Sequence, residues 1–200
     1  MKPYVLVAAL LALACLGWGC TDQVTNPRPS KGFVFSFEGS MEGWSKNGLD
    51  LENPTVAWDI GLNLDMARDS TSSVRFYLDN VNDKAKIYIE RAFAVDTSAD
   101  YHVRVTYQLA SRDFGDVNLW TIITGATSRP VASVGDLTPQ GNTGNGYPSD
   151  VGPVWMYKSY EFDLRSSDAG KIYVQIGIWG TSEFPRTYYL DPVYVSFTKP

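Results

Sequence analysis

The chain has 200 residues, 14% of them aromatic, with 17 glycines, 11 prolines and a formal charge of −5. This length is enough for one domain with a sizeable core. An acidic chain without a basic stripe argues against nucleic acid and anionic membrane surfaces as partners, and leaves neutral ligands such as sugars open. After residue 20 no long run of helix-forming residues follows a helical spacing, while aromatic residues and turn formers are frequent. This mixture favours an all-β sandwich.

The first twenty residues, 1–20, are expected to form a secretory signal and not part of the fold. Lys2 provides a short basic start, and an apolar segment follows that is too short for a comfortable membrane span. The signal ends in Gly19-Cys20, which resembles a bacterial lipobox in which Cys20 is lipidated and becomes the new N-terminus. Cys15 is a second candidate, and ordinary cleavage near Gly19 is the alternative. We therefore expect a secreted protein, lipid-anchored to the bacterial outer membrane or cell surface, that meets the membrane only through its anchor.

Both cysteines lie within this signal, so the remaining chain has neither a disulfide framework nor a cysteine-based zinc site or thiol nucleophile. Residues 21–31 are polar and contain two prolines, which is typical of a linker. Residues 32–198 are then expected to form one β-sandwich domain.

Period-two alternation of apolar residues predicts about eight or nine strands after the linker. The first, 32–38, places Phe33, Phe35 and Phe37 on one face, which is typical of a buried strand. The others are expected at 55–60, 72–78, 86–95, 101–111, 116–125, 154–164, 171–179 and 187–197. This number of strands with turns between them predicts an all-β fold, an antiparallel β-sandwich of the jelly-roll type.

The last two expected strands, 171–179 and 187–197, should form a hairpin through a turn that contains Gly, Ser and Pro. The final strand should also lie beside strand 32–38 and close the domain. Trp44 and Trp58 are expected in the core or in loop packing.

Three short motifs have counterparts in a known family. They are the opening FSFEGSMEGW, the strand YHVRVTY that begins at Tyr101, and the closing YYLDPVYV. They resemble the jelly-roll carbohydrate-binding modules of the galactose-binding-like superfamily, which often begin with a Phe-Glu plus Gly-Trp pattern and end with a Tyr-x-Asp-x-Val strand. The resemblance spans residues 32–198. It implies a non-catalytic domain that binds a polysaccharide or another glycan.

Strand parity places an unusual set of side chains on the faces opposite the core. Aromatic rings stack on the C–H faces of sugars, and arginine or amide side chains bond to hydroxyls, so a sugar site needs both. The expected ligand residues are Trp120, Trp155, Tyr157, Tyr173, Gln175, Trp179, Arg104 and Gln108. The same parity adds Tyr88, Glu90, His102, Asn118 and Glu161 to these faces. The alternative is that successive strands alternate between two sheets, so that some of these residues never meet.

The resemblance also implies a structural calcium ion between the start of the first strand and the last strand, with Glu38 and Asp191 as ligands. Calcium takes six to eight oxygen ligands, and here Pro192 stands where an acidic residue is often seen. The alternative is that Glu38 and Asp191 make ordinary hydrogen bonds to loops.

Residues 126–153, a stretch of about 28 residues rich in Gly, Pro, Asn and Ser, are too long for an ordinary connection. We expect either a lid or cleft wall, with Tyr147 and residues 142–146 contacting the ligand, or a plain surface loop.

Catalysis has little support in the sequence. His102 is the one histidine, and no motif surrounds it. A glycosidase needs two facing carboxylates, and no motif marks Glu90, Glu161 or Glu183 as such a pair. We therefore expect no enzymatic activity. The competing interpretation from another class is a structural or assembly protein that uses the same aromatic face to bind another protein. A small glycan-cleaving enzyme is the third and least favoured interpretation.

Overall fold

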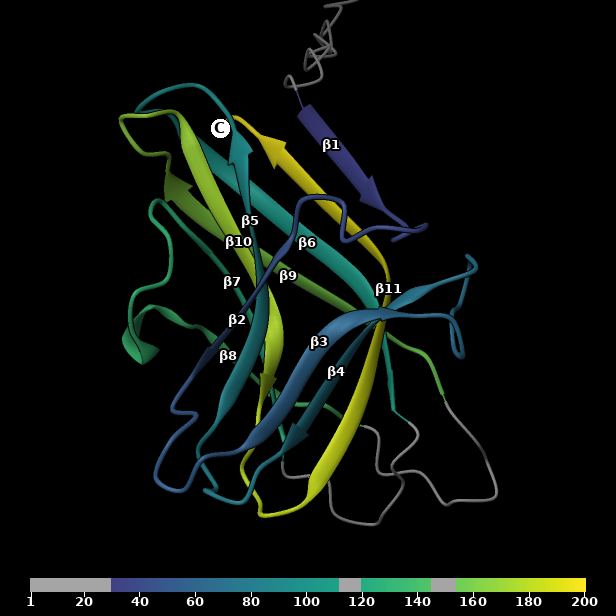
Figure 1. Cartoon of the computed structure of the whole chain (residues 1–200). Coiled ribbons are helices and arrows are strands. Elements are labelled where there is room, and N and C mark those ends of the chain that lie inside the picture. Colours follow the sequence, from purple (N-terminus) through teal and green to yellow (C-terminus); the bar gives the residue numbers. More distant parts are fainter. Residues whose placement is uncertain (1–29, 112–119, 145–153) are drawn as a thin grey trace, which may run out of the picture.

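The computed structural model describes residues 30–111, 120–144 and 154–200. These residues form an all-β sandwich of two antiparallel sheets (Figure 1). No helix within them is long and apolar enough to cross a membrane. The expected signal segment with Cys15 and Cys20 lies outside the described residues, as do Asn118 and Tyr147.

The larger sheet, sheet A, is organised around its longest strand. That strand, β11, pairs with β6 on one side, and with β4 and then β1 on the other. The strands of sheet A are β1 (Ser30–Phe35), β3 (Ala57–Asn63), β4 (Ser73–Asp79), β6 (Asp100–Ser111), β9 (Met156–Arg165) and β11 (Pro185–Thr198). Their order is β3-β4-β11-β6-β9, with β1 beside the second half of β11.

Sheet B has five strands in the order β2-β5-β10-β7-β8. They are β2 (Ser45–Leu49), β5 (Lys86–Ala94), β7 (Thr121–Thr127), β8 (Pro139–Asn142) and β10 (Lys171–Trp179). The connection between β7 and β8 contains a short 3₁₀ helix, η1 (Val134–Asp136). In Figure 1 this connection is the green segment at the left, beside sheet B.

The pairing of the first and last strands is confirmed. β1 and β11 are antiparallel, with Phe33 opposite Val195 and Phe35 opposite Val193. Phe35 and Phe37 are buried, and Phe33 packs against the same core. β1 begins at Ser30, so the strand includes the last two residues of the expected linker.

The expected hairpin of the last two strands is wrong. β10 lies in sheet B between β5 and β7, whereas β11 lies in sheet A, so residues 180–184 cross from one sheet to the other. Each of the two strands buries one face in the core between the sheets, with Ile176 of β10 on one side of the core and Leu190 of β11 on the other. Apolar and polar residues therefore alternate in both strands, although the strands belong to different sheets.

The core lies between the sheets and is rich in aromatic rings. The largest fully buried side chains include Trp120, Tyr107, Tyr188 and Phe37. Trp44 is buried in this core and Trp58 packs against it, as expected. The buried Tyr107 hydroxyl lies 2.6 Å from Thr124 Oγ1, and burial raises the pKa of Tyr107 well above its usual value.

Candidate functional site

The expected ligand residues fall into three separate places. Trp120 lies in the core. Arg104, Gln108, Trp155 and Tyr157 lie at the outer face of sheet A. Tyr173, Gln175 and Trp179 lie on the outer face of sheet B. Because the two outer faces are on opposite sides of the sandwich, these residues cannot form one surface, as the alternative anticipated.

Trp120 is fully buried, and its indole Nε1 donates to Ser182 Oγ at 3.1 Å. A ring enclosed in this way cannot stack on a sugar, so the expected role of Trp120 is wrong. The error lies in the parity of β7, where Ile122 and Ile123 are both buried. An apolar run without alternation does not show which of its residues face inward.

The outer face of sheet A carries charged side chains that pair with one another. Arg104 Nε donates to Glu161 Oε1 at 2.7 Å, and His102 Nδ1 lies 2.8 Å from Asp163 Oδ1. Exposed ion pairs of this kind contribute little to the stability of the fold and are typical of a solvated sheet face. Tyr157 is 64% exposed on the same face.

Trp155 precedes β9 and packs beside Met66, Ala110 and Tyr189. This small apolar cluster lies on the outside of sheet A, because Ala110 alternates with the inward-facing Leu109. Trp155 is half-buried there, on the side of the sandwich opposite Trp179.

On the outer face of sheet B, the strands bring side chains from distant parts of the chain into register. Lys86 of β5 lies opposite Trp179 of β10, and Glu90 lies opposite Gln175. On the other side of β10, Thr121 of β7 lies opposite Trp179. Trp179 is half-buried between these neighbours.

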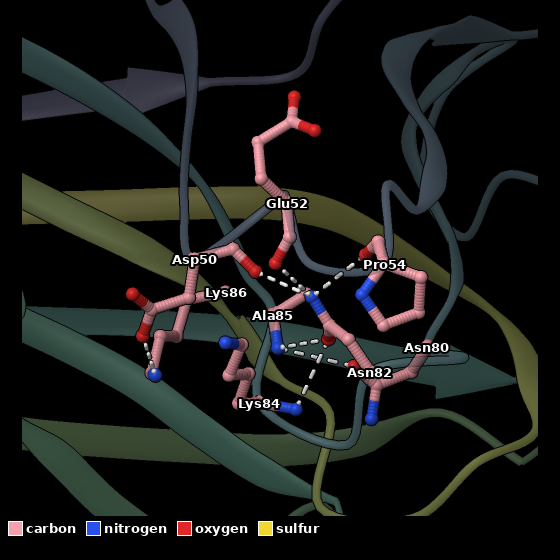
Figure 2. Close-up of polar contacts among 8 residues, drawn as sticks. All are labelled: Asp50, Glu52, Pro54, Asn80, Asn82, Lys84, Ala85 and Lys86. Carbon is pink, nitrogen blue, oxygen red and sulfur yellow. Dashed lines mark hydrogen bonds and ion pairs between the residues drawn. The ribbon is translucent and has the colours of Figure 1, made fainter.

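Lys86 and Trp179 form a cation–π pair. The Lys86 ammonium lies 4.5 Å from the ring centroid, within the range of a favourable contact. The same ammonium forms an ion pair with Asp50, which Figure 2 shows. The Lys86 side chain is only 4% exposed, whereas that of Asp50 is 38% exposed. The cation is therefore held in place on both sides.

The loop that carries Asp50 is fixed by an asparagine of the loop between β4 and β5 (Figure 2). Asn82 Nδ2 donates to the Asp50 carbonyl oxygen at 2.7 Å. Its Oδ1 accepts from the backbone N–H of Lys84 at 3.2 Å and of Ala85 at 3.1 Å. The position of Asp50 beside Lys86 is thus set by local hydrogen bonds.

A cavity of about 150 Å³ lies beside the indole, and we call it the Trp179 pocket. Its lining residues are Lys86, Ile123, Val134, Leu137, Pro139 and Trp179. Strands β5, β7 and β10 contribute three of these, and the connection between β7 and β8, with the start of β8, contributes the others. The first part of the stretch 126–153 therefore supplies a wall of a pocket, which agrees with the expectation of a cleft wall and not with that of a plain surface loop.

Gln175 and Glu90 hold this wall in place. Glu90 Oε2 accepts from Gln175 Nε2 at 2.9 Å and from the backbone N–H of Val131 at 3.0 Å. Gln175 Nε2 also donates to Thr127 Oγ1 at 2.9 Å. Gln175 is fully buried, so its expected role as a ligand contact is wrong, and its place is beneath the connection.

The same connection is stabilised by Asp136. Its Oδ2 accepts from the backbone N–H of Ala132 at 3.1 Å and of Ser133 at 2.9 Å, and its Oδ1 pairs with Arg129 Nη2 at 2.6 Å. These contacts, above all the hydrogen bond from Ala132, lower the pKa of Asp136. Nearby, burial raises the pKa of Tyr88 to about 12, with the charges of Glu90 and Asp136 adding to the effect.

Sequence reasoning missed most of the pocket. Lys86 could have been found, since it shares the outward parity of Tyr88 and Glu90 at the start of the same strand. Val134 and Leu137 showed no periodic signal, because they belong to an irregular connection.

The two expected calcium ligands both contact the loop between β3 and β4. Glu38 Oε1 accepts from the Thr71 backbone N–H at 2.9 Å. Asp191 Oδ2 accepts from the Arg68 backbone N–H at 2.9 Å and from Ser70 Oγ at 3.1 Å. Hydrogen bonds of the kind anticipated by the alternative are thus present.

Asp191 Oδ1 is buried and has no hydrogen-bond partner among the described residues. An orphaned carboxylate oxygen suits a cation. Within the described ranges, however, no group of three His, Cys, Asp or Glu side chains converges, and calcium takes six to eight oxygens. Among the described residues the side chains of the family pattern thus number two, Glu38 and Asp191, and calcium stays a prediction of the family resemblance.

The carboxylates considered for catalysis do not face one another. Glu90 lies on the outside of sheet B and Glu161 on the outside of sheet A. Glu183 is exposed in the loop between β10 and β11. Glu90 and Glu161 therefore cannot act on one bond from the two sides that a glycosidase requires.

Searches with known families and curated proteins found no match to this chain. Among solved structures, the K3 cleaved adhesin domain of Lys-gingipain from Porphyromonas gingivalis W83 is similar with a TM-score of 0.52 and 13% identity, over 84% of this chain and 99% of that one. The CBM22-1 xylan-binding domain of Paenibacillus barcinonensis Xyn10C has a TM-score of 0.47 and 11% identity, over 86% and 98% of the two chains. TmCBM61, solved with β-1,4-galactotriose, has a TM-score of 0.41 and 13% identity, over 72% and 88%. The structural neighbours thus include carbohydrate-binding modules of the β-sandwich type, and at these identities the likeness concerns the fold alone.

Proposed function

We propose that this chain is a non-catalytic glycan-binding domain that holds its ligand at the Trp179 pocket. The observation that carries the proposal is a half-buried indole beside a pocket whose wall is held by hydrogen bonds within the protein. Sugar sites combine an aromatic plate and apolar walls with a few fixed polar groups.

The polar groups at this site are already positioned. The Lys86–Asp50 pair lies beside the indole, and the half-exposed Asp50 carboxylate can accept hydrogen bonds from sugar hydroxyls. Because the two charges compensate each other, the pair favours neutral sugars over strongly charged ones. A site that needs no reorganisation also loses less free energy on binding.

The position of the pocket in the fold suits a tethered protein. β1 begins at Ser30, and Lys31 Nζ donates to the carbonyl oxygen of Ala94, which lies opposite Lys171 at the start of β10. Trp179 lies at the other end of β10, and nine strand residues span roughly 30 Å. Figure 1 shows the starts of β1 and β10 at the same end of the sandwich. The pocket therefore lies at the end of the domain opposite the start of β1, which is the end that an N-terminal anchor would leave accessible.

The test is a glycan array followed by affinity electrophoresis in polysaccharide gels, with wild type, Trp179→Ala and Tyr157→Ala. We expect wild type to bind at least one glycan, Trp179→Ala to lose that binding, and Tyr157→Ala to retain it, because Tyr157 lies on the opposite sheet. Circular dichroism establishes that each variant is folded. If wild type binds no glycan on either platform, the proposal fails.

A second candidate function is binding to another protein, and exposed apolar side chains at the same end favour it. Phe184 is 60% exposed and Val81 is 43% exposed. Their loops are tied together by Asn80 Nδ2, which donates to the Ser182 carbonyl oxygen at 2.9 Å. The variant Phe184→Ser separates the two functions, because it should weaken binding to a protein partner and leave glycan binding unchanged.

A further inference from the structure

We infer that the Trp179 pocket receives a methyl group carried by the sugar, either the methyl of a 6-deoxyhexose or that of an acetyl substituent. The inference rests on the proposed function and names the class of glycan that the site selects. It follows from the chemistry of the pocket walls, from the pocket's size and from the way its walls are held.

The walls are almost entirely apolar. Ile123, Val134, Leu137 and Pro139 present only carbon atoms in their side chains, and Trp179 adds its ring. A hydroxyl group that enters such a pocket gives up its bonds to water and finds no replacement, which is costly. A methyl group has no hydrogen bonds to give up there, and its transfer from water into an apolar pocket is favourable in free energy.

Lys86 supplies the one charged group among the lining side chains, and that group is already engaged. Its ammonium pairs with Asp50 and lies 4.5 Å from the Trp179 ring centroid. To bind a sugar hydroxyl inside the pocket, Lys86 would have to leave one of these partners. The lysine therefore closes the pocket with its stem and does not provide a free donor within it.

The size of the pocket suits a substituent and not a whole ring. Its volume is about 150 Å³, whereas pockets that enclose a complete small ligand measure roughly 300–1,000 Å³. A sugar ring at this site therefore remains at the mouth, beside the indole and Asp50, while a small group projects inward.

The wall contributed by the connection is fixed, so the pocket cannot easily adapt to a polar group. Val131 is bonded to Glu90, and Ala132 and Ser133 are bonded to Asp136. Val134 and Leu137 follow directly on this bonded segment. A rigid apolar wall discriminates by leaving a mismatched polar group unpaired.

The test compares free monosaccharides that differ at one position, with binding followed by NMR titration of the whole domain. L-Fucose and L-galactose differ only by the hydroxyl at C6, and N-acetyl-D-glucosamine and D-glucose differ only at C2. We expect the methyl-bearing sugar of at least one pair to bind at least tenfold more tightly, which corresponds to about 1.4 kcal/mol. The pair that shows the preference distinguishes a deoxy sugar from an acetylated one.

A variant of the wall tests where the preference arises. Leu137→Asn places an amide in the pocket and should reduce the tenfold preference to about twofold or less. Leu64→Asn is the matched control, because Leu64 is 77% exposed in the loop after β3 of the other sheet, and it should leave the preference intact. The comparison of sugar pairs on wild type needs no variant and stands even if Leu137→Asn does not fold.

The failures of the two proposals are distinguishable. Equal affinity within both sugar pairs, with binding still lost in Trp179→Ala, overturns the methyl inference and leaves glycan binding in place. Binding to a glycan of the array but to none of the four monosaccharides overturns the methyl inference alone, and binding to no glycan on either platform overturns both.

Discussion

Lys86 and Trp179 lie opposite each other in the register of β5 and β10, and the lysine ammonium stands 4.5 Å from the centre of the indole ring. The ammonium is also paired with Asp50, whose loop is held by Asn82. One side of the indole is therefore occupied by the protein itself. The indole also lines the Trp179 pocket, and this is where the ligand contact is expected.

Replacing Lys86 by methionine should weaken this arrangement without unfolding the domain. Methionine keeps an unbranched apolar stem but removes the ammonium, so the cation–π contact is lost and Asp50 loses its partner. We expect the free energy of unfolding to fall by about 1–2 kcal/mol, measured by urea denaturation. Lys84→Met is the control, since Lys84 is exposed on the preceding loop. An equal loss in Lys84→Met would contradict this account of Lys86.

Trp120 and Trp179 should respond differently to truncation. Trp120→Ala opens a cavity in the core and should lower the free energy of unfolding by about 3–5 kcal/mol. Trp179 is half-buried at the surface, so Trp179→Ala should cost about 1–2 kcal/mol of stability. Urea unfolding of the two variants side by side measures the difference. An equal loss of unfolding free energy in the two variants would contradict the placement of Trp120 in the core and of Trp179 at the surface.

Acid should loosen the pocket wall through Asp136. Hydrogen bonds, chiefly from the Ala132 backbone N–H, lower the pKa of Asp136 in the folded protein. A carboxylate with a depressed pKa stabilises the fold above its unfolded pKa of about 3.9, and this contribution is lost as the pH falls through the lower, folded value. Amide exchange at Ala132 and Ser133, corrected for its intrinsic pH dependence, should therefore accelerate below about pH 4.

Asp136→Asn should show the loosened wall already at neutral pH, with no further change in acid. Asp163→Asn is its control, because Asp163 pairs with His102 on the outside of sheet A. Unchanged exchange in Asp136→Asn at neutral pH would contradict the role given to this carboxylate.

Asp191 holds the loop between β3 and β4 through one oxygen, while its other oxygen is buried without a partner among the described residues. Asp191→Asn keeps an acceptor for the Arg68 and Asp69 N–H groups and removes the buried charge. Asp191→Ala leaves those donors unpaired. In the presence of a chelator we expect Asp191→Asn to be at least as stable as wild type and Asp191→Ala to lose about 1–3 kcal/mol.

Calcium titration of the same proteins addresses the metal prediction. A rise in wild-type Tm with calcium that disappears in Asp191→Asn would support a metal at this position. No change in Tm with calcium would argue against it.

Much of the fold follows from alternation alone. β6, β10 and β11 were expected close to their observed bounds, because each buries one face, as with Val103 and Val105 of β6. β2 and β8 were not expected. Both are edge strands with polar sequences, SKNGL and PQGN, and neither has a fully buried residue. A strand that buries so few side chains shows no period-two alternation of apolar residues in its sequence.

The site was predictable only in part, for a physical reason. Parity shows which side chains of a strand face outward, and it placed Tyr173 and Trp179 on the same outer face, although Tyr173 does not line the Trp179 pocket. Parity does not show which sheet a strand joins, so Arg104 and Tyr157 were assigned to the same surface although they lie on the other side. The pairing of Lys86 with Asp50 and the contact of Glu90 with Val131 join distant segments and depend on the tertiary fold.

The most direct measurement of the central claim is an NMR titration that follows the indole N–H signals while the glycan selected on the array is added. With the ligand at the Trp179 pocket, we expect the Trp179 signal to shift in a saturable way, while the signals of the buried Trp44 and Trp120 stay in place. A saturable shift of the Trp155 signal with none at Trp179 would instead place the ligand on sheet A and rule out the Trp179 pocket as its site.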